Sequence, residues 1–178
     1  MIKRDKTIMI GCDYQDRLFP AVYNTDTLMD KTLRLMKGLK VLGVPVIFTQ
    51  QYTKGLGHTS EAIREAAGNN DYLEKIRFSA WSVLKDVLPS PEEKPYVLIG
   101  GIESHVCVLQ TAIELKENGY KVFYVADCAS SRSKRDYKLA LKRAEQEGII
   151  ITSCESILFE LLEEAGTETS KAIQRIVK

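Results

Sequence analysis

One cysteine of this 178-residue chain stands where a reactive group is often presented. Cys107 follows an apolar run at residues 96–99, the pair Gly100-Gly101 and a short polar turn, and it opens a helical pattern. A buried strand, a tight turn and a helix N-terminus would place its sulfur at the mouth of an α/β sheet. Backbone N–H groups and the positive end of the helix dipole favour a thiolate there. Position alone leaves two roles open for Cys107, an acyl-transfer nucleophile and a small buried core residue.

Asp13 is the residue best suited to act as a partner of Cys107. A cysteine nucleophile needs a base that takes its proton or a cation that stabilises the thiolate. Asp13 ends the first apolar run, where its carboxylate is either such a base or a simple cap of a turn. His105 lies two residues before Cys107, and residues two apart on a helix do not face each other. His58 lies in a glycine-rich loop and is a candidate lid residue.

The other three cysteines are expected to pack in the interior. Cys12 precedes Asp13 in a predicted strand, so its side chain is expected to point to the opposite face. Cys128 and Cys154 follow strand ends but open no helix. The chain has no Cys-x-x-Cys pair and no secretion signal, which favours reduced thiols and a cytoplasmic protein.

Strand-length apolar runs alternate with longer helical patterns along the chain. The predicted strands are residues 7–13, 45–50, 96–101, 120–127 and 148–152. The predicted helices are residues 28–42, 59–67, 81–88, 106–118, 133–148, 155–165 and 169–177. This alternation predicts a single α/β domain over residues 1–178, a three-layer αβα fold with a central, mostly parallel sheet.

The predicted topology brings Asp13 and Cys107 to one place. In a doubly wound sheet, ligands bind outside the carboxyl ends of the strands, where the winding direction reverses. With the five-strand order 2-1-3-4-5, that crevice lies between the first and third strands, which are followed by Asp13 and Cys107. Residues 52–95 form a long insertion, and insertions of that length are usually functional.

Composition excludes several classes of function. Lys and Arg number 25 and Asp and Glu 24, a net charge of +1 that gives no reason to expect a nucleic-acid or membrane partner. No apolar run is long enough to span a bilayer. The two histidines are not spaced as metal ligands, and no phosphate-binding glycine motif is complete, so neither a metal nor a cofactor is expected.

Three separated motifs point to a known family. Asp13-Tyr14-Gln15 follows the first predicted strand, residues 74–81 (Glu-Lys-Ile-Arg-Phe-Ser-Ala-Trp) fall in the insertion, and residues 101–108 (Gly-Ile-Glu-Ser-His-Val-Cys-Val) follow the third strand. In order and spacing they resemble the isochorismatase-like cysteine hydrolases, which include nicotinamidases and N-carbamoylsarcosine amidohydrolase. The resemblance covers nearly the whole chain. Residues 50–57 and 127–133 are similar to the compact isochorismatase-domain subgroup.

The resemblance implies an Asp–Lys–Cys triad formed by Asp13, Lys75 and Cys107. It also implies a cis peptide bond between Ile102 and Glu103, which would direct the backbone N–H groups of Glu103 and Cys107 together as an oxyanion hole. In the implied mechanism Asp13 accepts the thiol proton and Cys107 attacks an amide-like carbonyl. Asp13 then protonates the leaving amine, and water hydrolyses the thioester.

Departures from the family pattern narrow the expected substrate. Nicotinamidases carry an Asp-x-His…His metal site where this chain has Gln50-Gln51-Tyr52, so a zinc-dependent nicotinamidase is not expected. True isochorismatases need no cysteine nucleophile, so Cys107 favours amide, carbamoyl or ester cleavage. Family members are commonly dimers or larger, which implies a homo-oligomer. The candidate pocket residues, for which core or interface packing is the alternative, are Gln15, Phe19, Gln50, Tyr52, Trp81 and His105.

Two other classes of function remain open at this point. One is an interaction protein that keeps the triad without turnover. The other is a redox-responsive protein in which a low-pKa Cys107 is oxidised rather than acylated.

Overall fold

A six-stranded parallel sheet forms the centre of the protein. The computed structural model describes residues 1–178. The strand order is β3-β2-β1-β4-β5-β6, and all neighbouring strands pair in parallel. The strands are β1 (Thr7–Cys12), β2 (Val46–Gln51), β3 (Tyr72–Lys75), β4 (Tyr96–Ile102), β5 (Lys121–Ser130) and β6 (Ile150–Thr152).

The inner strands are apolar on both faces because helices cover both sides of the sheet. In β1, Ile8 and Ile10 join one buried cluster while Met9, which lies between them, joins the other. In β4, Leu98 joins the cluster of Met9, whereas Val97 joins that of Ile8. This is why such strands read as continuous apolar runs rather than alternating ones.

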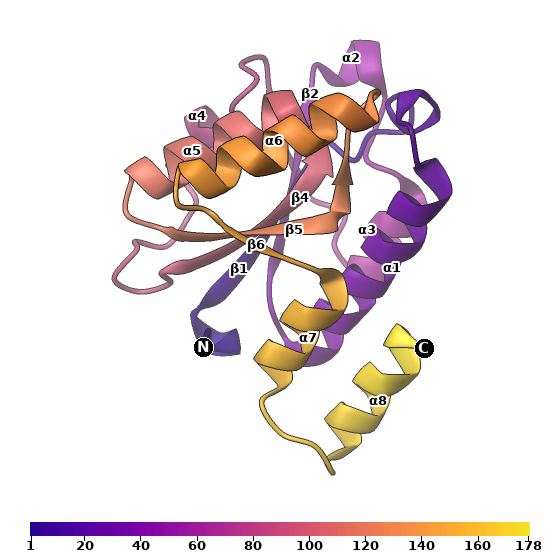
Figure 1. The fold of residues 1–178 in the computed structure, drawn as a ribbon, viewed down its shortest axis with the longest axis vertical. Coiled ribbons are helices and arrows are strands. Elements are labelled where there is room, and N and C mark those ends of the chain that lie inside the picture. The colour runs from indigo at the N-terminus through magenta and orange to yellow at the C-terminus, as the bar shows by residue number, and fades with distance from the viewer.

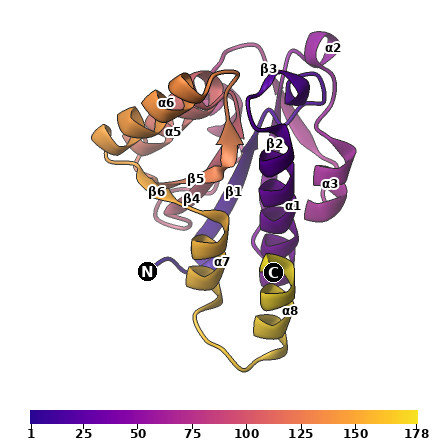
Figure 2. The same ribbon diagram turned by 45° about the vertical axis from the view of Figure 1, so that its right-hand side comes forward.

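The helices form two layers, one on each face (Figures 1 and 2). Helices α1, α3, α7 and α8 contribute to the cluster of Met9, and α4, α5 and α6 to that of Ile8. No helix is long and apolar enough to cross a membrane. The helices are α1 (Thr25–Leu42), α2 (Thr53–Leu56), α3 (Glu61–Ala67), α4 (Trp81–Leu84), α5 (Leu109–Glu117), α6 (Lys134–Gln146), α7 (Cys154–Leu162) and α8 (Glu168–Val177).

Helix ends follow the local sequence signals. Gly43 ends α1 in the left-handed conformation, at φ 72°, and its N–H donates to the carbonyl of Leu39. Ser133 caps α6, and its hydroxyl accepts a hydrogen bond of 3.1 Å from the N–H of Arg135.

The three-layer α/β fold and the order of the five predicted strands are confirmed, with one strand added. The predicted order corresponds to β2-β1-β4-β5-β6, and β3 extends the sheet beyond β2. Strand β3 lies inside the stretch that the sequence suggested was an insertion without strands. The short helix predicted for residues 81–88 ends at Leu84, and β5 continues to Ser130 rather than stopping at residue 127.

Candidate active site

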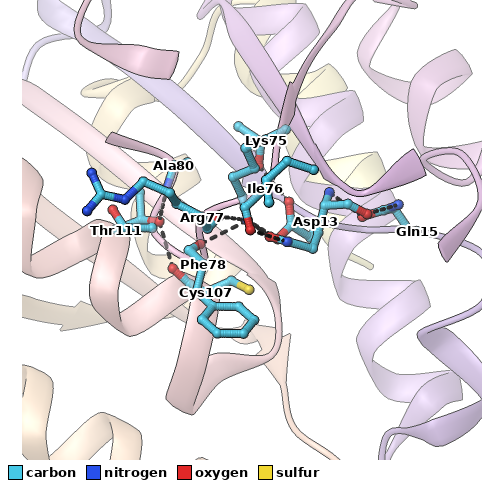
Figure 3. Close-up of polar contacts among 12 residues, drawn as sticks. Asp13, Gln15, Lys75, Ile76, Arg77, Phe78, Ala80, Cys107 and Thr111 are labelled. Carbon is cyan, nitrogen blue, oxygen red and sulfur yellow. Dashed lines mark hydrogen bonds and ion pairs between the residues drawn. The ribbon is translucent and has the colours of Figure 1, made fainter. Parts of the chain in front are cut away.

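Asp13, Lys75 and Cys107 meet at the carboxyl ends of three strands. Asp13 directly follows β1, Lys75 is the last residue of β3, and Cys107 lies in a π-helical turn (Ser104–Val108) between β4 and α5. In a parallel sheet these ends share one edge, so residues far apart in sequence come together there. Figure 3 shows Asp13 and Lys75 in contact beside the sulfur of Cys107.

The Asp13 carboxylate is fully buried and has a partner on each oxygen. Its Oδ2 lies 2.7 Å from Nζ of Lys75, and both side chains have 0% exposure. Its Oδ1 accepts a hydrogen bond of 2.8 Å from the hydroxyl of Thr49. Because a buried carboxylate without partners is costly, these two contacts offset the cost of burying Asp13 inside the fold.

The chain after β3 turns back around the ammonium group of Lys75 and holds it in the site. Besides Asp13, Nζ donates to Oε1 of Gln51 at 2.7 Å and to the carbonyls of Phe78 at 2.9 Å and Arg77 at 3.3 Å. Burial alone would lower the pKa of Lys75, but neighbouring groups that carry or can take up negative charge, Asp13 among them, raise the pKa above its ordinary value. Lys75 is therefore a permanent cation in the site.

Cys107 is a neutral thiol in this structure. It is 7% exposed, and its pKa is raised to about 12, first by burial and then by the charge of Asp13. The Lys75 charge and a backbone hydrogen bond from Glu103 act in the opposite direction. The sequence favoured a thiolate held by a helix N-terminus. Cys107 does lie in the first helical turn, Ser104–Val108, which runs directly into α5, but burial and the neighbouring Asp13 raise the pKa of the thiol instead of lowering it.

The turn before Cys107 depends on a close approach of β4 to its neighbours. The peptide bond between Ile102 and Glu103 is cis. A Cβ atom on Gly101, which has φ 149°, would overlap the carbonyl oxygen of Cys12, and one on Gly100 would lie 2.6 Å from that of Cys128. Glycine at both positions lets β4 lie flat against β1 and β5 at the point where the chain turns toward Cys107.

A cavity of about 270 Å³ opens beside the thiol. Its lining is largely apolar, and charge enters it through Asp13, Glu103 and Arg132. Arg132 is 68% exposed, and its Nε lies 2.6 Å from Oε1 of Glu103. The complete lining is Asp13, Leu18, Gln51, Leu56, Phe78, Ile102, Glu103, Val106, Cys107 and Arg132.

The structure does not bring the six predicted pocket residues into this lining. Two of them serve the scaffold: the Gln15 amide donates to the carbonyls of Gln51 and Gly57, and Phe19 stacks on Tyr14 in the core. The Gln50 side chain is fully buried without a hydrogen-bond partner.

The remaining three predicted pocket residues also lie elsewhere. Tyr52 is 51% exposed, and Trp81 lies edge-on to Tyr120 and lines a different cavity with Ser82 and Lys85. His105 binds the hydroxyl of Ser131 through Nδ1 at 2.9 Å.

His105 does not form a catalytic triad with its neighbours. The same Nδ1 atom that contacts Ser131 lies 3.4 Å from Oε2 of Glu103. A serine–histidine–carboxylate triad needs one ring nitrogen for each partner. His58, the other histidine, packs edge-on to Tyr72.

Sequence reasoning missed Gln51, Arg132 and the place of Cys12. Gln51 shares a strand face with Thr49, two residues away, so the strand period separates it from Gln50. Arg132 lies between β5 and α6 beside Lys134 and Arg135, where a charged side chain is usually solvated. Cys12 packs in the same cluster as Cys107 because it shares a strand face with Ile8 and Ile10, and the left-handed backbone of Asp13, at φ 58°, ends the alternation after it.

Comparisons with known proteins agree with this architecture. Residues 7–156 match the isochorismatase domain model. Isochorismatase domain-containing protein 1 of Salmo salar is 38% identical over 175 residues, which cover 97% of this chain and 61% of the salmon protein. Isochorismatase family protein 1B of Dictyostelium discoideum is 36% identical over 172 residues, which cover 94% and 84% of the two chains.

Solved structures show the same fold. The structure of MAR1 ribonuclease from Caenorhabditis elegans has a TM-score of 0.88 and 31% identity, with 99% of this chain and 91% of that chain covered. The chain spans less than two thirds of the salmon relative but most of the Dictyostelium and Caenorhabditis proteins. With a domain match over most of its length and relatives above 30% identity, this chain belongs to the isochorismatase family.

Proposed function

We propose that the protein is a cysteine hydrolase that cleaves an amide, carbamoyl or ester bond of a small molecule. The observation that carries the proposal is the position of Asp13, which is paired with the Lys75 ammonium and lines the same cavity as the Cys107 thiol. A carboxylate in that position is a base within reach of the nucleophile's proton.

The proposed reaction passes through a thioester on Cys107. Asp13 takes the thiol proton as the sulfur attacks the substrate carbonyl, and the N–H groups of Glu103 and Cys107 stabilise the oxyanion. Asp13 returns the proton to the leaving group as the bond to that group breaks. Asp13 then takes a proton from the water that attacks the thioester, and that proton returns to the sulfur. Lys75 remains charged throughout and balances the negative charge that moves between Asp13 and the sulfur.

The dimensions and lining of the cavity support a small substrate. A volume of about 270 Å³ with largely apolar walls suits a compact molecule with an apolar substituent next to the scissile carbonyl. One structural relative carries the name ribonuclease. In this chain the only exposed cation of the lining, Arg132, is already paired with Glu103, so we favour a small molecule over RNA.

The redox alternative receives little support from the thiol itself. Redox-sensing cysteines are low-pKa and accessible, whereas the pKa of Cys107 is raised and its side chain is nearly buried. The interaction-protein alternative predicts that Asp13→Asn and Lys75→Ala leave every cellular phenotype intact.

Activity assays on a panel of small amides, carbamoyl compounds and activated esters test the proposal. We expect a burst of leaving group from at least one activated ester, and Cys107→Ala abolishes it. An RNA oligonucleotide belongs in the panel. Its cleavage without any ester or amide turnover would contradict the small-molecule assignment.

We propose a homo-oligomer, which the exposed apolar side chains Tyr72, Ile76 and Phe78 on and after the edge strand β3 support. No cofactor enters the proposed reaction. A cytoplasmic location stays a prediction from the sequence.

A further inference from the structure

One buried hydroxyl joins the turn that carries the nucleophile to a second segment of the site. Thr111 lies on α5, four residues after Cys107, and is fully buried. Its Oγ1 donates to the carbonyl of Cys107 at 2.6 Å and accepts a hydrogen bond of 2.9 Å from the N–H of Ala80 (Figure 3). Thr111 does not line the cavity, so any effect on the reaction passes through its two partners.

The segment that Thr111 contacts is the one that surrounds Lys75. Ala80 comes two residues after Phe78, whose carbonyl accepts from Nζ of Lys75 at 2.9 Å. Fixing Ala80 therefore limits where that carbonyl lies. The hydroxyl of Ser79 makes a second contact to α5 by donating to Glu114. Residues 76–80 are thus attached to α5 at two points, one buried and one partly buried.

We propose that Thr111 is a positioning residue, whose hydroxyl holds residues 76–80, and with them the Lys75 ammonium, in place against Cys107. The inference rests on the proposed function, in which Lys75 and Cys107 act together. It assigns a role to a residue that contacts neither the substrate nor the reacting atoms.

Loss of the hydroxyl has a defined electrostatic consequence. Lys75 lowers the pKa of Cys107, while burial and Asp13 raise it. Thr111→Val leaves the Ala80 N–H and the Cys107 carbonyl without their hydroxyl partner, so residues 76–80 shift to satisfy the N–H elsewhere. A looser segment holds the ammonium less closely, and the pKa of Cys107 then rises further.

The pH dependence of Cys107 alkylation by iodoacetamide tests this role. We expect the Thr111→Val protein to alkylate about tenfold more slowly at a fixed, mildly alkaline pH, the equivalent of about one unit of pKa. Thr111→Ser, which keeps the hydroxyl, restores the wild-type profile. Thr7→Val is the matched control, because Thr7 is also buried and its hydroxyl also donates to a backbone carbonyl, at 2.6 Å, but far from the site.

Several outcomes overturn the proposal. It fails if Thr111→Val keeps the wild-type profile, if Thr111→Ser reacts as slowly as Thr111→Val, or if Thr7→Val slows alkylation equally. If Thr111→Val does not fold, Ser79→Ala loosens the same segment at its other contact, and a wild-type profile there counts against the proposal. Alkylation needs no substrate turnover. Failure of every ester to acylate Cys107 would therefore remove the hydrolase assignment without deciding the role of Thr111.

Discussion

Asp13 lies between a buried ammonium and a buried thiol, and its charge affects the two neighbours differently. It helps to keep Lys75 protonated, and it raises the pKa of Cys107. The resting site therefore contains one carboxylate, one ammonium and a neutral thiol. In this arrangement the nucleophile is not ionised in advance, and proton transfer to Asp13 accompanies attack on the substrate.

Replacing Asp13 is expected to make the Cys107 thiol easier to alkylate and, at the same time, to slow turnover. Asp13→Asn removes a negative charge and a base together. Because Asp13 raises the pKa of Cys107, we expect the alkylation profile of Asp13→Asn to move to lower pH. Turnover of an activated ester is expected to fall by about 10²–10⁴, the usual contribution of a general base.

A remote carboxylate provides the control for that experiment. Asp127 is partly buried and accepts a hydrogen bond of 2.7 Å from the N–H of Cys154, away from the triad. Asp127→Asn should leave both measurements at the wild-type level. An alkylation profile of Asp13→Asn that moves to higher pH would contradict the electrostatic assignment.

The site is built from strand ends and from the turn after β4. Some of these elements could be predicted from the sequence and others could not. Strands β1 and β4 could be predicted because helices cover both their faces, which makes each a continuous apolar run. Strand β3 could not, because it has four residues, half of them charged, and lies at the sheet edge. Lys75 was therefore found through family resemblance and not through its position in the sheet.

Local backbone conformation explains the other errors. Cys12 keeps the side that β1 gives to Ile8 and Ile10, but Asp13 lies beyond the strand with a left-handed backbone, so the expected opposition of the two side chains does not hold. The prediction chose Gln50, but alternate residues of a strand point to opposite faces. Gln51 is the residue that shares a face with Thr49, and its side chain contacts Lys75.

The Gly100-Gly101 pair yields a prediction about stability. Gly101→Ala places a Cβ atom into the Cys12 carbonyl and strains the backbone, so we expect it to lower the free energy of unfolding by more than about 2 kcal/mol. Gly43→Ala is the matched control, since Gly43 has φ 72° with no atom within 4 Å of the added Cβ, and it should cost about 1 kcal/mol. Denaturant unfolding measures both. Equal losses would contradict the close approach of β4 to β1.

Connection order allowed much of the architecture to be predicted. Alternating strands and helices with right-handed crossovers leave few topologies, and the order 2-1-3-4-5 brings Asp13 and Cys107 to one crevice. The shape of the cavity could not be predicted in the same way. Its walls include Leu18, Leu56 and Phe78, which come from loops and short helices whose positions depend on packing across the fold.

Self-association is testable on the intact chain. Light scattering should give a mass at least twice the 20.1 kDa of one chain. Ile76→Asp, which places a charge on a side chain exposed by 72% next to the edge strand β3, is expected to lower that mass. Leu139→Asp on α6, where the residue is 53% exposed, is the control and should not. A monomeric wild-type protein would contradict the homo-oligomer, and an unchanged mass for Ile76→Asp would contradict this edge as the interface.

The mass of the protein after brief exposure to p-nitrophenyl acetate tests the hydrolase account most directly. Acid quenching traps the thioester, and intact-mass analysis followed by peptide mapping locates it. We expect one added acetyl group, located on Cys107 and absent from Cys107→Ala. No adduct across a panel of activated esters and amides, or the same adduct in Cys107→Ala, would contradict Cys107 as the nucleophile.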